Sequence, residues 1–185
     1  MNDMSSRIVA DAGGRGARFT TAEFTRMCEL GAFENMKVEL VDGELERLIK
    51  PFANHAHWQA LVLIRLATEC PHERLVGEAG IDMGDDTVLG CDAALLYAPA
   101  PLRWLKPDEV LLVIEVSGTT LARDLGLKLQ RYAAACIPTY WVVDGSGEVV
   151  HVYTGPQDGA YQQHTVIRFM EPLSVPGSDA TITLA

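Results

Sequence analysis

The chain lacks any apolar run near the roughly 20 residues that a membrane-spanning helix requires. Its longest, residues 110–114, has only the length of a strand. The first residues also lack the apolar core of a secretory signal peptide. We therefore expect a cytoplasmic protein without a membrane segment.

Cysteine is scarce and scattered. The four cysteines are far apart in the sequence and form no C-x-x-C pair; they are Cys28, Cys70, Cys91 and Cys136. Without a secretory signal, we expect them to be buried free thiols rather than disulfides. A zinc site that combines two of them with His55 and His57 is a weaker alternative, because the ligand spacing is poor.

Positive charge is scarce as well. The 15 lysines and arginines against 25 aspartates and glutamates give a formal net charge of -10. This balance argues against a protein that coats nucleic acid nonspecifically, because such binding depends on basic side chains that displace counterions. A nuclease remains compatible with it, since metal-binding carboxylates add to the negative total and a local basic strip can exist on an acidic protein.

The length of 185 residues favours one domain, and it suffices for a core without disulfide or metal support. Hydrophobic residues make up 48% of the chain and charged residues 22%, which is ordinary for a globular protein. Residues 1–18 are rich in Gly, Ser, Asp and Arg without periodicity. We expect a flexible N-terminal leader there and a single domain over residues 19–185.

Hydrophobic periodicity predicts three helices and a set of strands. The helices are expected at about 20–30 behind Thr20 or Thr21, at 54–69 behind Asn54, and at about 120–136 behind Thr119 or Thr120. The last is expected to bury a stripe of Leu121, Leu125, Leu129, Tyr132 and Cys136.

The strands are expected at 37–49 as a hairpin around Asp42-Gly43, then at 74–97 around a turn at 84–86, with its second strand at 92–97. Further strands follow at 110–116, 140–143, 149–153 and 161–169, and the residues after 171 favour turns. The order predicts an α/β fold: a mixed central β-sheet flanked by helices, with one crossover between Glu115 and Tyr140.

Glu115 is the residue that fits its surroundings least. It interrupts the run Leu-Leu-Val-Ile-Glu-Val, which otherwise has the pattern of a buried strand. An unpaired carboxylate in such a place costs several kcal/mol, so a cation must offset its charge. A structural salt bridge is the simplest interpretation, and a metal ion is the other.

Asp92 strengthens the second interpretation. It begins another apolar strand, and alternation puts Val113, Glu115 and Ser117 on one face of the strand that carries Glu115. If the two strands are neighbours, the carboxylates of Asp92 and Glu115 converge and repel each other unless a cation lies between them. Hard oxygen ligands suit Mg²⁺ or Mn²⁺. An ordinary turn acid before a strand is the alternative for Asp92.

Lys128 and Glu39 complete the candidate set. Lys128 lies one helix after Glu115, where it either forms an exposed pair with Asp124 or reaches inward toward a metal-bound water or a phosphate. The spacing alone does not favour either interpretation of Lys128. Glu39, on the first hairpin, is the better of two local acids to face the pair. His55 and His57 start a helix, where capping or surface roles are the default, and Tyr140 and Trp141 are expected in the core.

These motifs together resemble the Uma family of restriction-endonuclease-like proteins. The specific part is residues 114–124, Ile-Glu-Val-Ser-Gly-Thr-Thr-Leu-Ala-Arg-Asp, followed by Lys128, Tyr132, Ile137-Pro138 and residues 140–144. Residues 38–45 resemble the family's E-L-I-D-G-E hairpin, and Pro51 to His55 resemble its S-P-x-x-H helix start. The match runs from about Phe19 to Tyr153.

The resemblance implies a restriction-endonuclease-like fold of the PD-(D/E)XK kind and a metal-dependent endonuclease. Asp92, Glu115 and the carbonyl of Val116 would hold Mg²⁺ or Mn²⁺, Lys128 would be the migrated lysine, and Glu39 would be an additional acid. Ser117 stands where the PD-(D/E)XK pattern has its lysine, and Cys91 stands where the family usually has proline, which ligates nothing.

The implied partner is nucleic acid, with DNA expected first, in a bacterial cytoplasm and without a membrane. A homodimer is compatible with this reading, because cutting both strands of a duplex often needs two sites. Arg103, Lys106, Arg123 and Arg131 are candidate phosphate contacts, although solvated surface charge is the simpler interpretation of each. The alternative function is a non-catalytic binding or assembly module that keeps the buried acids and Lys128 as a structural pair.

Overall fold

The computed structural model describes residues 16–49, 52–118 and 120–185. Residues 1–15 of the expected leader, Pro51 of the family motif and Thr119 as a helix cap therefore lie outside the described residues. The chain forms two compact units, one of Met1–Lys50 and Asp82–Leu89 and one of Pro51–Ile81 and Gly90–Ala185.

The first unit begins with helix α1 (Thr21–Glu29). Thr20 is its N-cap: the Thr20 hydroxyl accepts the Glu23 amide at 3.2 Å, and the Glu23 carboxylate accepts the Thr20 amide at 2.9 Å. This capping box satisfies two amides that the first turn leaves without helical partners. The predicted start of the helix is confirmed, and Gly31 follows its end with a φ of 77°.

The predicted Asp-Gly hairpin is also confirmed in the first unit. Strands β1 (Lys37–Val41) and β2 (Glu44–Leu48) pair in antiparallel fashion. Asp42 and Gly43 both have positive φ, 50° and 79°, which a two-residue turn of this type requires. β1 also pairs with β4 through Leu40 and Val88.

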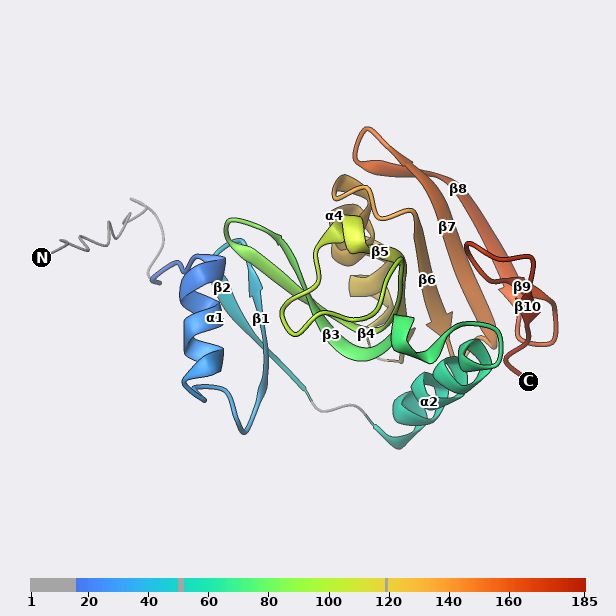
Figure 1. Ribbon diagram of the computed structural model, residues 1–185, viewed down its shortest axis with the longest axis horizontal. Helices are drawn as coiled ribbons and strands as arrows, with labels where there is room; N and C mark the ends of the chain where they lie inside the picture. The colour runs from blue at the N-terminus through green and yellow to red at the C-terminus, as the bar shows by residue number, and fades with distance from the viewer. Residues whose placement is uncertain (1–15, 50–51, 119) are drawn as a thin grey trace, which may run out of the picture. The chain divides into compact units, whose positions relative to one another are not determined.

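The second unit is built on a mixed sheet (Figure 1). β3 (Leu75–Gly84) and β4 (Thr87–Leu96) pair with each other, and the parts of both strands outside Asp82–Leu89 belong to this unit. β4 also runs antiparallel to β5 (Val110–Ser117). β5 is parallel to β6 (Thr139–Asp144), and β7 (Val149–Gln157) and β8 (Ala160–Arg168) follow in antiparallel order. Short η1 (His72–Arg74) and η2 (Pro107–Glu109) precede β3 and β5. The predicted mixed sheet and its crossover are confirmed.

Helices cover both faces of this sheet. α2 (Ala53–Ala67) packs the buried Val62 and Leu66 against Ile114 and Trp141. The crossover consists of α3 (Leu121–Arg123), the π-helical segment η3 (Asp124–Lys128) and α4 (Leu129–Ala134). It lies on the other face, where the Tyr132 ring is 5.1 Å from the Tyr140 ring. Among the described residues, no helix is both long enough and apolar enough to cross a membrane.

Two predicted boundaries were wrong. β4 begins at Thr87 rather than at Asp92, because Thr87, Val88 and Leu89 are buried and continue the strand back to its turn. Asp92 therefore lies inside a strand. α2 begins at Ala53 with Phe52 at the N-cap, so Asn54 is within the helix and does not cap it.

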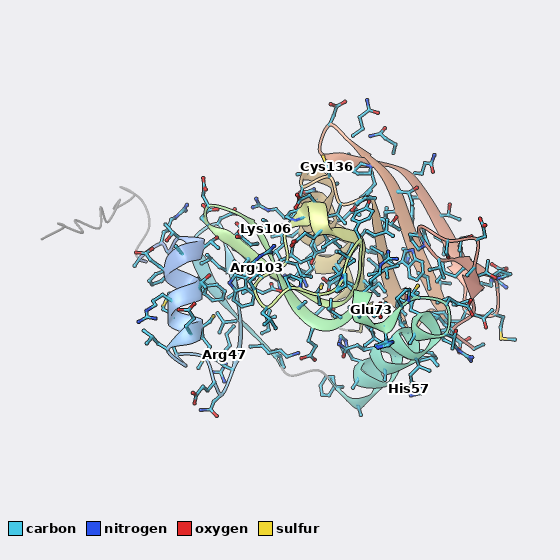
Figure 2. All side chains as sticks on the ribbon, viewed as in Figure 1. Arg47, His57, Glu73, Arg103, Lys106 and Cys136 are labelled. Carbon is cyan, nitrogen blue, oxygen red and sulfur yellow. The ribbon has the colours of Figure 1, made fainter. Side chains whose placement is uncertain are left out.

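The predicted apolar stripe of the crossover was correct only at Tyr132, which is buried. The other fully buried side chains include Asp124 and Lys128, whereas Cys136 is exposed and is labelled in Figure 2. Of the other cysteines, Cys91 is buried and Cys28 and Cys70 are partly buried. The π segment shifts the face that the helix presents to the sheet, so a regular period of 3.6 residues misplaces the stripe.

The residues after Glu171 are better ordered than their turn-rich sequence suggests. β9 (Leu173–Ser174) and β10 (Thr181–Ile182) form a small antiparallel pair. The buried side chains of Leu173, Val175, Ile182 and Leu184 join the core cluster beneath α2. Isolated apolar residues spaced by turns carry little periodic signal, which explains why the sequence pattern did not reveal them.

The core assignment of α2 can be tested by two substitutions on the same helix. Leu66 is fully buried, whereas Ile64 is 63% exposed. Leu66→Ala is expected to lower the free energy of unfolding by about 2–5 kcal/mol, because it removes buried methyl groups and leaves a cavity. Ile64→Ala is expected to change it by less than about 0.5 kcal/mol. Urea denaturation of both variants measures the difference, and equal losses would contradict this packing.

Candidate active site

The crossover helix brings a charged side chain to the buried face of the sheet. Lys128 ends the π segment, and its side chain is only 7% exposed. Gly126 lies in the middle of the same segment, where its low helix propensity favours an irregular turn. π-helical turns of this kind occur often at functional sites, since they redirect the side chains that follow.

Lys128 meets Glu115 there. Its Nζ donates to Oε1 of Glu115 at 2.9 Å and to the main-chain oxygen of Gly90 at 2.7 Å. The Tyr132 hydroxyl donates to the same Oε1 at 2.9 Å. Because the Glu115 side chain is only 4% exposed, these two donors supply the hydrogen bonds that water supplies to a surface carboxylate.

The protonation of Glu115 depends on this pair. Burial raises the pKa of Glu115 well above its ordinary value, while the charge and hydrogen bond of Lys128 lower it and the charge of Asp92 raises it further. The ammonium group of Lys128 thus favours the anionic form of this carboxylate, against the larger effect of burial.

Asp92 is held from two other elements. The β4–β5 pairing begins at Ala93 and Ile114, and the amide of Val116 donates instead to Oδ2 of Asp92 at 2.7 Å. On the other side, Nε2 of His55 lies 3.2 Å from Oδ1. The Asp92 side chain is 18% exposed, so it is less deeply buried than Glu115.

The two acids have opposite electrostatic character. Burial alone would raise the pKa of Asp92, but the hydrogen bonds from His55 and from the Val116 amide outweigh it, so the pKa is lowered from its ordinary value. The charge of Lys128 acts in the same direction. Asp92 is thus a stable anion near neutral pH, beside a glutamate whose charge depends on a lysine.

Asp124 does not form the exposed pair with Lys128 that was one of its two interpretations. It is buried, and its Oδ2 accepts the hydroxyls of Ser117 at 2.7 Å and Thr120 at 2.8 Å. The Tyr140 hydroxyl donates to its main-chain oxygen at 3.1 Å. These bonds fix the start of the crossover to the end of β5, and so place Lys128 one turn further along.

The oxygens of this cluster fit a hard divalent cation. Among the described residues, no three His, Cys, Asp or Glu side chains lie close enough together to hold a metal ion by themselves. Mg²⁺, however, is usually bound by one or two carboxylates with water or substrate oxygens. Lys128 and Tyr132 both bond Oε1 of Glu115, so Oε2 can serve as a ligand, and Asp92 is partly open to solvent.

Glu39 is buried on β1 in the first unit. Arg103 and Lys106, both labelled in Figure 2, lie on the loop before η2, where Arg103 binds Glu109 through two hydrogen bonds of 2.9 and 2.6 Å. The hydrogen bonds from Arg103, together with one from the Lys106 amide, lower the pKa of Glu109 to about 2.

Sequence reasoning did not assign His55, Gln59 or Tyr132 to the site. His55 was expected to have a capping or surface role, yet it contacts Asp92, and Gln59 donates to the main-chain oxygen of Asp92 at 2.7 Å. The spacing of four residues puts His55 and Gln59 on one helix face, which is a signal that the sequence carries. Tyr132 was expected only as core, and its hydroxyl gave no sequence signal.

Comparison with known proteins identifies the family. The model of the Uma2 family, described as "Putative restriction endonuclease", matches residues 21–185. The chain belongs to the Uma2 family. This confirms the resemblance drawn from the motifs around Glu115 and Lys128.

A solved structure supports the fold of this Uma2 protein. It is described as "a putative nuclease belonging to DUF820 from Anabaena variabilis ATCC 29413" and shares 16% identity, with a TM-score of 0.64, over 90% of this chain and 95% of that chain. At this identity the likeness concerns the fold alone. A comparison with curated proteins finds no match to the chain.

Removing the ammonium group should expose the cost of the buried glutamate. Lys128→Met is expected to lower the free energy of unfolding by about 3–5 kcal/mol, because it leaves Glu115 without a cation. Glu115→Gln in the same chain should restore much of the loss, since Gln is neutral and can still accept from Tyr132. Denaturation in the presence of a chelator measures both, and Lys106→Met, at an exposed position, is the control. A double variant no more stable than Lys128→Met would contradict the assignment.

Proposed function

We propose that this Uma2 protein is a metal-dependent endonuclease that hydrolyses phosphodiester bonds in nucleic acid. The observation that carries the proposal is the 2.9 Å contact between Lys128 of the crossover and Glu115 of the buried strand β5. Asp92 lies on the neighbouring strand β4. Two acids can hold a divalent cation, and a lysine can stabilise charge that develops on a phosphate. The family and the fold of its relative agree with a nuclease.

The ion in this proposal is Mg²⁺ or Mn²⁺, held by Asp92, Glu115 and the main-chain carbonyl of Val116. When bound, such an ion lowers the pKa of water and neutralises charge on the phosphate. The chain's own contribution is the set of oxygens. The lowered pKa of Asp92 keeps its carboxylate ionised and ready to bind a cation.

Lys128 has two tasks in the proposed reaction. It favours the ionised form of Glu115 against the effect of burial, and its ammonium group would orient the attacking water or stabilise charge that develops on the phosphate. Its Nζ donates to Glu115 and to the main-chain oxygen of Gly90, and these two bonds hold the ammonium group beside the acids.

The proposed substrate is DNA, and the proposed setting is the cytoplasm of a bacterial cell, with a homodimer as the form that would cut a duplex. The charge of -10 makes strong nonspecific binding unfavourable. Phosphate contacts must therefore come from a few local cations. The proposed contacts are Arg103, Lys106, Arg123 and Arg131, of which Arg103 binds Glu109 in this structure.

Cleavage of plasmid and single-stranded DNA in Mg²⁺ or Mn²⁺ tests the proposal. Asp92→Asn, Glu115→Gln and Lys128→Met are each expected to lower the rate by at least about 100-fold, because each removes a ligand or the charge partner. Asp158→Asn is the matched control: Asp158 is exposed in a turn with a φ of 52°, which Asn tolerates. Undiminished cleavage in Asp92→Asn and Glu115→Gln would refute the catalytic assignment.

Metal binding can be measured without any substrate. Saturating Mn²⁺ is expected to raise the melting temperature of the wild-type protein, since a ligand that binds only the folded state stabilises it, and Asp92→Asn is expected to abolish the shift. A wild-type protein without a shift would favour the alternative, a non-catalytic binding or assembly module in which Lys128 and Glu115 form a structural pair.

A further inference from the structure

Helix α2 contacts Asp92 at two points. Nε2 of His55 lies 3.2 Å from Oδ1 of Asp92, and the amide of Gln59 donates to its main-chain oxygen at 2.7 Å. The two side chains are one turn apart on the same helix face. One helix thus holds both the backbone and the carboxylate of a single residue.

The fold itself does not require these contacts. α2 is already anchored by the fully buried Val62 and Leu66. His57, two residues after His55, is exposed on the same helix and is labelled in Figure 2. By contrast, the His55 side chain is only 17% exposed, and its Nε2 is turned to the carboxylate. A histidine that served only the helix start could stay in solvent as His57 does.

The contacts fix the orientation of the Asp92 carboxylate. Oδ1 is held from α2 by His55, and Oδ2 is held from β5 by the Val116 amide at 2.7 Å. Donors on both oxygens, from two different elements, restrict rotation about the Cβ–Cγ bond, which is otherwise a soft torsion. Each oxygen has two lone pairs, so each keeps one for another partner in a direction that the protein has set.

We propose that His55 is a positioning residue, which holds Asp92 in the orientation that binds a divalent cation while Gln59 fixes the strand behind it. The inference rests on the proposed function. Nε2 must carry a proton to donate to the carboxylate, and both the Nε2–H tautomer and the imidazolium meet that condition. Groups that orient a metal ligand in this way typically change metal affinity by 10- to 100-fold when they are removed.

Isothermal titration of the full chain with Mn²⁺ alone tests this role. His55→Ala is expected to weaken Mn²⁺ binding by about 10- to 100-fold, because the carboxylate is then free to rotate. His55→Gln should stay within a few-fold of the wild type, since its amide nitrogen extends about as far as Nε2. His55→Asn should behave like His55→Ala, because its shorter amide reaches only as far as Nδ1.

The matched control is His57→Ala, which removes an exposed histidine from the same helix and should leave Mn²⁺ affinity unchanged. A folded His55→Ala that binds Mn²⁺ like the wild type would overturn the inference and leave the proposed function standing. If His55→Ala does not fold, the Gln and Asn variants decide: equal affinities overturn the inference, and tighter binding by Gln supports it. A wild-type chain that binds no Mn²⁺ overturns the proposed function and the inference together.

Discussion

The ion pair between Lys128 and Glu115 is the constraint on which the second unit depends. Glu115 lies in a strand whose every residue is buried, and an ion left alone there costs several kcal/mol. Lys128 reaches it at 2.9 Å from the crossover helix, so that helix must lie over β5 with its lysine inward. The hydroxyls of Ser117 and Thr120 on Asp124 hold the helix start in the register that makes this possible. An apolar stripe alone would be compatible with several rotations of the helix about its axis, whereas the buried ion pair is compatible with one.

The two acids are held by different structural elements, and this explains their different electrostatic character. Glu115 points to the crossover side, where Lys128 and Tyr132 reach a single oxygen. Asp92 is held by a histidine of α2 and by a main-chain amide of β5, neither of which is a permanent cation. Glu115 is thus deeply buried beside an ammonium group, whereas Asp92 keeps some contact with solvent and has a lowered pKa. An ion bound by both acids would have one deeply buried ligand, Glu115, and one partly exposed ligand, Asp92.

The sequence was most informative where a residue conflicts with its local pattern. Glu115 in an apolar run, the Asp-Gly turn and the capping box at Thr20 each follow from short-range physics, and the fold class follows from their order. The interior direction of Lys128 could not be predicted, because the π segment breaks the helical period on which the apolar stripe was built. His55 was missed for another reason: its partner is 37 residues away in the chain, and only the packing of α2 on the sheet brings it to Asp92.

In the proposed function, a divalent cation would also help the substrate to bind, because it would change the net charge of the site. With both acids ionised, Asp92, Glu115 and Lys128 together carry one net negative charge, in a chain that is already strongly acidic. A phosphate would be repelled by that cluster, and the buried lysine cannot offset both carboxylates because it is bonded to one of them. In the proposed function, a single divalent ion would reverse the sign of the cluster, and its effect would be large because water is largely excluded around Glu115. Substrate affinity would then depend on the ion, as the rate would.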